Sequence, residues 1–128
     1  KYISNKNPLF YFGANAVTIF PHIYIKNNLE IPAVGLNAIV IHEKIHLNQQ
    51  QKDGKSWFVK YVFSKKFRLS QELDAYKAEY KFWVNDNNLR KYKINPVEVR
   101  KSIARSLSGK TYFGMIGYQE ALDIVNKW

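Results

Sequence analysis

The chain has 128 residues, of which 46% are hydrophobic and 16% aromatic, and its formal net charge is +10. This composition excludes an intrinsically disordered protein, and the length predicts one domain, residues 1–128, with a real hydrophobic core. Cysteine is absent, which excludes disulfides and thiolate metal ligands. No apolar run reaches the roughly 18–20 residues that a membrane span requires.

The N-terminal part of the chain contains three short segments typical of strands. Phe10–Phe12, Val17–Phe20 and Ile23–Lys26 are apolar or alternate in polarity, with a glycine and Pro21 between them. They predict a small antiparallel sheet, in which Pro21 and His22 would suit an edge.

The next segment carries the most informative pattern, HEKIH at residues 42–46, which has the form HExxH. On a helix His42 and His46 lie one turn apart on the same face, with Glu43 beside them. Two such imidazoles can reach one Zn²⁺, and the carboxylate can take a proton from a metal-activated water. Pro32 to Leu47 is apolar nearly all round, which predicts a core helix. A core helix whose histidines and glutamate only hydrogen-bond each other is the structural alternative.

A zinc site requires a third protein ligand. No histidine follows the motif, so the candidates are His22 and a downstream carboxylate. Trp57–Phe67 is predicted to be a short aromatic core helix. A second strong helix follows, with an inward stripe of Leu69, Glu72 or Leu73, Tyr76, Tyr80 and Trp83. If this helix runs antiparallel to the HExxH helix, Glu72 lies over the face that carries His42 and His46.

Two further helices are predicted near the C-terminus. Residues 86–88 are expected to end the Glu72 helix, and Asn95 and Pro96 open another as N-cap and first helical residue. Ser108 and Gly109 close that helix, and residues 119–128 form the last one.

The motifs HEKIH and ELDAY, at residues 42–46 and 72–76, resemble the gluzincin zinc metallopeptidases, in particular the very small minigluzincin-like proteins. The resemblance covers roughly residues 35–83. It implies a mainly helical α+β zincin-like domain with a small N-terminal antiparallel sheet. It also implies that His42, His46 and Glu72 bind Zn²⁺ and that Glu43 is the general base of peptide hydrolysis. Gln49 to Gln51 resembles small phage-type HExxHxxQ proteins.

The chain departs from larger gluzincins at one position. Those proteins often carry an Asp four residues after the ligand Glu, where it orients the first His, and this chain has Tyr76 there. Metal-binding imidazoles usually donate their second N–H to a carboxylate or carbonyl. Glu79 is the first candidate for that partner of His42, with Asp74 behind it.

Hydrolysis also requires a donor that stabilises the oxyanion. Tyr76 is one turn from Glu72 and is the predicted catalytic donor, and His22, Tyr112 and Tyr118 are the alternatives.

Zinc-dependent hydrolysis of a peptide or protein substrate is the predicted function. The positive charge favours an anionic partner, either cell wall or nucleic acid. One alternative is a catalytically silent zinc-binding structural or interaction module of a phage particle. Another is a basic nucleic-acid-binding domain in which the motif is coincidental. With no visible signal peptide and no initiating Met, we expect a processed or trimmed soluble product, either cytoplasmic or phage-associated.

Overall fold

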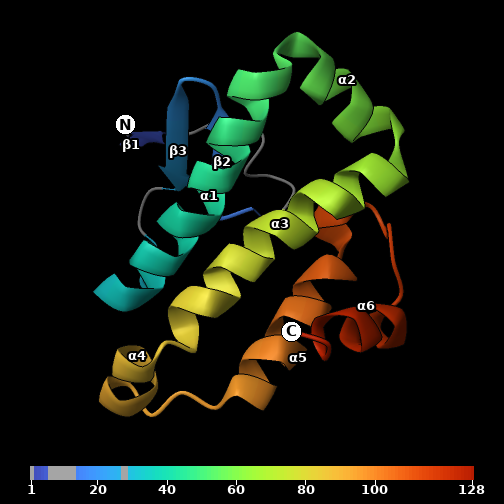
Figure 1. Cartoon of the computed structure of the whole chain (residues 1–128). Helices are drawn as coiled ribbons and strands as arrows, with labels where there is room; N and C mark the ends of the chain where they lie inside the picture. Colours follow the sequence, from blue (N-terminus) through green and yellow to red (C-terminus); the bar gives the residue numbers. More distant parts are fainter. Residues whose placement is uncertain (1, 6–13, 27–28) are drawn as a thin grey trace.

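The computed structural model describes residues 2–5, 14–26 and 29–128 (Figure 1). Its elements are β1 (Tyr2–Asn5), β2 (Ala16–Ile19), β3 (His22–Lys26), α1 (Ala33–Asp53), α2 (Lys55–Phe63), α3 (Lys65–Trp83), α4 (Asp86–Lys91), α5 (Pro96–Leu107), the 3-10 helix η2 (Lys110–Tyr112) and α6 (Tyr118–Val125). The predicted mainly helical α+β fold with a small N-terminal sheet is confirmed. No described helix is long and apolar enough to cross a membrane.

The sheet has the order β1-β3-β2, with β2 antiparallel and β1 parallel to β3. The antiparallel pair corresponds to two of the predicted strands, whereas the parallel strand β1 was not predicted. The expected strand at 10–12 lies outside the described residues. The prediction of an edge at Pro21 and His22 was wrong, because His22 opens the central strand. Among the described strands, β2 is the edge beside the helices.

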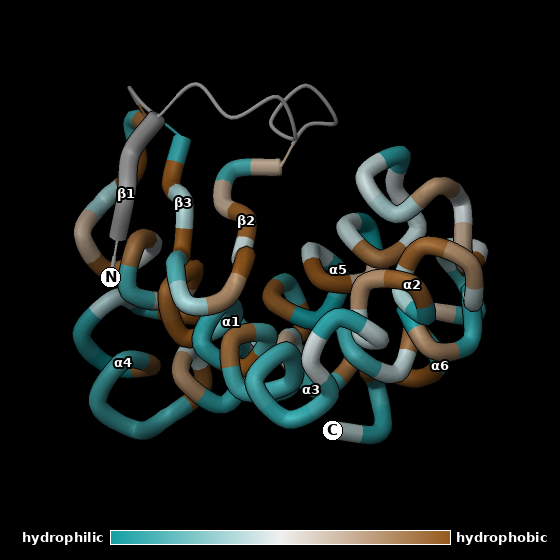
Figure 2. Tube along the Cα trace, turned by 90° about the horizontal axis from the view of Figure 1, so that it is seen from above, coloured by the Kyte–Doolittle hydropathy of each residue, from teal (hydrophilic) through white to brown (hydrophobic). Residues whose placement is uncertain are grey.

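The elements form successive layers, which Figures 1 and 2 show from two directions. Helix α1 contacts β2 and β3 of the sheet as well as α3, and α3 in turn contacts α5, which packs on α6. The HExxH helix therefore lies between the sheet and α3.

The chain changes direction at Gly54 and Ser64, which separate successive helices, and α3 then packs against α1. Gly54 has φ 63° and ψ −147°, a conformation essentially restricted to glycine, and it separates α1 from α2. Ser64 ends α2, and its side chain accepts a hydrogen bond from the backbone N–H of Phe67 at 3.1 Å. The predicted single helix at 57–67 is therefore divided at Ser64.

The boundaries of the later helices follow their caps. Helix α3 ends at Trp83, and residues 86–88 open α4 behind the N-cap Asn85 rather than simply ending α3. Asn95 caps α5 through its side chain and Pro96 is the first helical residue, as predicted.

Helix α1 is not buried on all sides, so this part of the prediction was wrong. Its buried residues are Ala38, His42, Glu43, His46 and Gln50, a stripe with four-residue spacing plus Glu43. Its large apolar side chains are only partly buried, and Leu36 is exposed. The most buried face of α1 is therefore largely polar.

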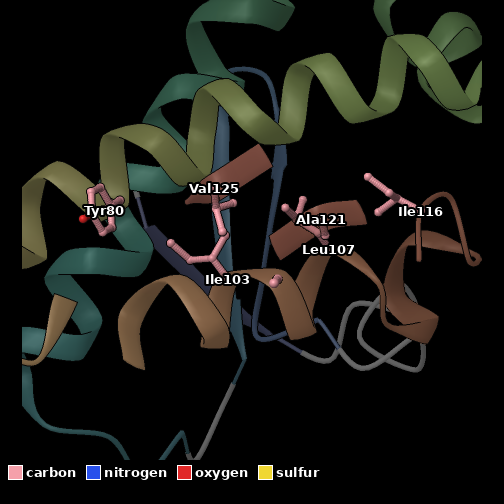
Figure 3. Packing of buried hydrophobic residues seen from close by; sticks show 7 residues of the cluster. Tyr80, Ile103, Leu107, Ile116, Ala121 and Val125 are labelled. Atoms are coloured by element: carbon pink, nitrogen blue, oxygen red, sulfur yellow. The ribbon is translucent and has the colours of Figure 1, made fainter. Parts of the chain in front are cut away.

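The hydrophobic core lies between α3, α5 and α6 (Figure 3). Ile103 and Leu107 of α5 pack with Ala121 and Val125 of α6, and Tyr80 of α3 lies at one end of this cluster. The apolar core is thus separate from the polar stripe of α1, and both use α3 as a wall.

We expect Leu107→Ala to lower the free energy of unfolding by about 2–5 kcal/mol, because Leu107 is fully buried and its loss leaves a cavity. Urea unfolding followed by circular dichroism measures the change. Val97→Ala is the control, since Val97 is exposed on α5. Equal effects of the two substitutions would contradict this assignment of the core.

Candidate metal centre

Three buried side chains from α1 and α3 converge on one point. The distance between the Nε2 atoms of His42 and His46 is 3.2 Å. Glu72 Oε2 lies 3.3 Å from His42 Nε2, and Glu72 Oε1 lies 3.2 Å from His46 Nε2. Ligand atoms about 2.0–2.1 Å from a tetrahedral zinc ion lie about 3.3–3.4 Å from one another. The three residues are therefore spaced to hold one metal ion.

The hydrogen bonding of Glu72 fits a cation at this point. Tyr61 of α2 donates its phenol hydrogen to Oε1. Oε2 is buried and makes no hydrogen bond within the described part of the chain. A buried carboxylate oxygen without a hydrogen-bond donor, 3.3 Å from the Nε2 atom of His42, requires a proton or a metal ion as its partner.

The Nδ1 atom of each imidazole faces a side-chain oxygen that orients the ring. Glu79 Oε2 lies 3.6 Å from His42 Nδ1, and Gln49 Oε1 lies 2.9 Å from His46 Nδ1. When each Nδ1 carries a hydrogen directed at these oxygens, each Nε2 has its lone pair directed at the shared point. The Gln49 amide is itself held, because its Nε2 donates to the Gln71 carbonyl at 3.2 Å.

The pKa values follow from burial and from these partners. Burial opposes the charged form of His42, but the neighbouring carboxylates of Glu72 and Glu79 outweigh it and raise the pKa of His42 from 6.5 to about 10. The pKa of His46 is raised as well, since Glu72 outweighs the effect of its burial. Burial would raise the pKa of Glu72, but the two imidazoles lower it. Glu72 is therefore ionised at neutral pH.

Glu43 follows His42 in α1 and is held by β2. Thr18 Oγ1 donates to Glu43 Oε2 at 2.6 Å. Gln50 joins the same elements, because its Nε2 donates to the Thr18 carbonyl and its Oε1 accepts from the backbone N–H of Phe20, both at 2.8 Å. The edge strand β2 is thereby positioned next to the HExxH helix.

Two cavities meet at the site. Both have His42, Glu43 and Tyr112 in their walls. The larger cavity, about 970 Å³, extends along α5 and carries charged side chains from Glu79, Lys93, Glu98 and Arg105. The smaller cavity, about 360 Å³, extends towards α2 and is mainly apolar, with Trp57, Phe58 and Val62 in its wall.

Two tyrosines line the larger cavity beside His42, and Tyr112 lines the smaller cavity as well. The Tyr76 ring meets the edge of the His42 ring at a centroid distance of 4.3 Å, and the Tyr76 and Tyr112 hydroxyls lie 2.9 Å apart. Burial, followed by the charge of Glu72, raises the pKa of both phenols, so both remain neutral donors.

Most of the residues singled out in the sequence meet at this site. His42, Glu43, His46, Glu72, Tyr76, Glu79 and Tyr112 lie together, whereas Asp74 is exposed and neither His22 nor Tyr118 lines either cavity. Thr18 and Tyr61 also belong to the site but were not predicted, because no local pattern in the sequence marks them. For Gln49, the HExxHxxQ pattern was a usable signal.

The chain matches no protein-family model and no curated protein, and its structure matches no solved structure. The chemistry of this site is therefore inferred from its own residues.

We expect Tyr61→Phe to weaken metal affinity by about 10- to 100-fold, because the Glu72 carboxylate loses the hydrogen bond that orients it. Isothermal titration calorimetry with Zn²⁺ measures the affinity. Wild-type protein should bind about one ion per chain and His46→Ala none. Tyr118→Phe, at a half-exposed tyrosine outside the cavities, is the matched control. Unchanged affinity in Tyr61→Phe would show that this phenol does not support the site.

We expect zinc binding at pH 7.5 to release at least one proton per chain, because the raised pKa keeps His42 protonated without the metal, the pKa of His46 is raised as well, and the ion binds only neutral imidazoles. Affinity should therefore rise with pH until His42 loses its proton near pH 10. Titrations in buffers of different ionisation enthalpy count the protons. Glu79→Gln removes one cause of the raised pKa of His42, so this variant should release fewer protons when zinc binds. Binding without proton release would contradict this charge state.

Proposed function

We propose that the protein is a zinc-dependent peptidase in which His42, His46 and Glu72 hold the ion and Glu43 is the general base. The observation that carries this proposal is the position of Glu43, which lines both cavities together with His42 and whose charge acts on both imidazoles. A purely structural metal site has four protein ligands, whereas this cluster of three leaves a position for a reacting molecule.

Zinc is the ion that best suits this donor set. Two imidazoles and one carboxylate, about 3.3 Å apart, match its preferred tetrahedral geometry. When bound, the ion supplies Lewis acidity, which lowers the pKa of a coordinated water and polarises a carbonyl group.

Glu43 has the contacts that a general base requires. Thr18 binds Oε2 and so limits rotation of the carboxylate. Oε1 is then available to accept a proton from water and to return it to the departing amine nitrogen. The carboxylate is buried, which excludes most competing solvent.

The oxyanion that forms during hydrolysis requires a neutral hydrogen-bond donor. We assign this role to Tyr76, as the sequence predicts, with Tyr112 as its partner. When the Tyr112 hydroxyl donates to the Tyr76 oxygen, the Tyr76 hydrogen is directed elsewhere and can reach a substrate oxygen. The raised pKa values keep both phenols protonated up to strongly alkaline pH.

A peptide or protein substrate fits the shape of the site. Residues 14–16 line the larger cavity and residues 16–19 line the smaller one, so β2 runs past the catalytic groups. Within the described sheet only one side of β2 is paired. Gln50 already binds the Thr18 carbonyl and the Phe20 N–H, and an extended peptide can pair with the rest of the free side and pass its backbone in front of Glu43.

We expect Glu43→Gln to lower the rate of hydrolysis of fluorescein-labelled casein by about 10²- to 10⁴-fold while about one zinc ion per chain stays bound. Glu120→Gln, an exposed carboxylate on α6, is the matched control and should keep full activity. The rate of hydrolysis is measured from the release of fluorescent casein fragments, and the bound zinc is measured by elemental analysis.

Three results would contradict the peptidase. Wild-type protein that binds zinc but hydrolyses no peptide indicates a catalytically silent binding module. Equal activity in Glu43→Gln excludes Glu43 as the base. No bound zinc, even when the ion is supplied, leaves the basic surface as the main functional feature.

A further inference from the structure

Helix α2 has an apolar face that is largely exposed among the described residues. Phe58, Val59, Val62 and Phe63 form this α2 apolar face, and their exposed fractions are 37%, 60%, 64% and 85%. Successive residues of an α-helix are about 100° apart, so these four fall within an arc of about 140°. Trp57 and Tyr61 lie on the opposite side, directed towards the metal centre.

So much exposed apolar area on one short helix is unusual for a surface that only meets water. Scattered single apolar residues are common on protein surfaces, but contiguous patches mark interaction sites. Helix α2 lies at the upper right corner of the molecule in Figure 1, away from the sheet and from α4.

The surroundings of the α2 apolar face are basic. Lys55 and Lys60 are in α2, and Lys65 and Lys66 follow it at the start of α3, all four exposed. Between residues 51 and 71 the only acidic residue is Asp53. The patch therefore combines apolar side chains with a local positive charge, in a chain whose net charge is +10.

We propose that the α2 apolar face docks the protein onto an anionic lipid surface. An amphipathic helix with aromatic and aliphatic side chains, flanked by lysines, inserts its apolar residues at the headgroup boundary while the lysines meet lipid phosphates. The absence of a spanning helix among the described residues fits peripheral attachment.

The charges decide against a second copy of the chain as the occupant. Two such faces would bring their exposed lysines together, and the repulsion would oppose association. A folded acidic protein would need a complementary surface, whereas the lipid layer adapts to a convex helix. This proposal does not depend on catalysis.

Docking would also place the smaller cavity at the membrane. Phe58 and Val62 belong both to the α2 apolar face and to the wall of that cavity. The opening on this side of the metal centre would then meet lipid or a chain emerging from it.

The test is sedimentation of the full chain with vesicles of phosphatidylcholine alone and of phosphatidylcholine with phosphatidylglycerol. We expect binding only to the anionic vesicles, with at least about tenfold weaker binding at 1 M salt, where the screening length falls to about 3 Å. The double variant Val62→Ser, Phe63→Ser should bind at least about tenfold more weakly. In the double variant Lys65→Gln, Lys66→Gln, the affinity for anionic vesicles should fall by about 10- to 30-fold.

Matched controls separate this face from general charge and hydrophobicity. Val97→Ser changes an exposed valine on α5, and Lys77→Gln, Lys81→Gln changes two exposed lysines on α3. We expect each of these control variants to lose less than about threefold in affinity for anionic vesicles. Circular dichroism checks the fold of every variant.

Several outcomes would overturn the proposal. Wild-type protein that stays in the supernatant with anionic vesicles excludes lipid docking, and equal losses in the control variants exclude α2 as the docking site. A dimer that dissociates on Phe63→Ser identifies the face as an interface between copies. Binding to polyglutamate that does not depend on Val62 or Phe63, without vesicle binding, points to an acidic protein partner.

Discussion

The structure depends on the burial of Glu72 between α1 and α3, opposite two buried imidazoles. Only 2% of Glu72 is exposed, so its charge has lost nearly all contact with water. Leaving such a charge without partners would cost several kcal/mol, on the order of 3–5 when one member of a buried pair is removed. His42, His46 and Tyr61 supply those partners, and a bound cation would complete them.

This polar contact joins α1 and α3 at the free-energy cost of desolvating a charge. Apolar residues of similar volume would pack α1 against α3 without desolvating any charge. The chain has such an apolar contact nearby, between α3, α5 and α6. The cluster of His42, His46 and Glu72 is therefore better explained by chemistry than by stability, as is common where burial and charge shift pKa values together.

Helix α2 connects the site with the molecular surface. Its inner side supplies Tyr61 to Glu72, and Trp57 donates through its Nε1 to the Gln71 side chain at 2.9 Å. Arg68 of α3 holds the end of this helix, because its Nη1 donates to the Tyr61 carbonyl at 2.6 Å. A ligand on the outer side of α2 would thus act on an element that also orients a candidate metal ligand.

The sequence by itself determined the local features of this protein. The HExxH spacing places His42 and His46 on one helix face, and the 3.6-residue periodicity marks Glu72 or Leu73, and Tyr76, on the inward side of α3. The caps at Asn95 and Pro96 predict the start of α5, because capping depends on neighbouring residues alone. Alternation around Pro21 likewise indicated β2 and β3.

Only the tertiary structure decided which distant residues meet. The contacts of Thr18 with Glu43 and of Tyr61 with Glu72 join residues far apart in the chain, and nothing local distinguishes that threonine or that tyrosine from others. The apolar composition of α1 suggested burial on all sides, yet its most buried stripe is largely polar, because the candidate metal centre lies there between the sheet and α3. Periodicity shows which face of a helix turns inward, whereas the identity of the facing partner depends on how the helices pack.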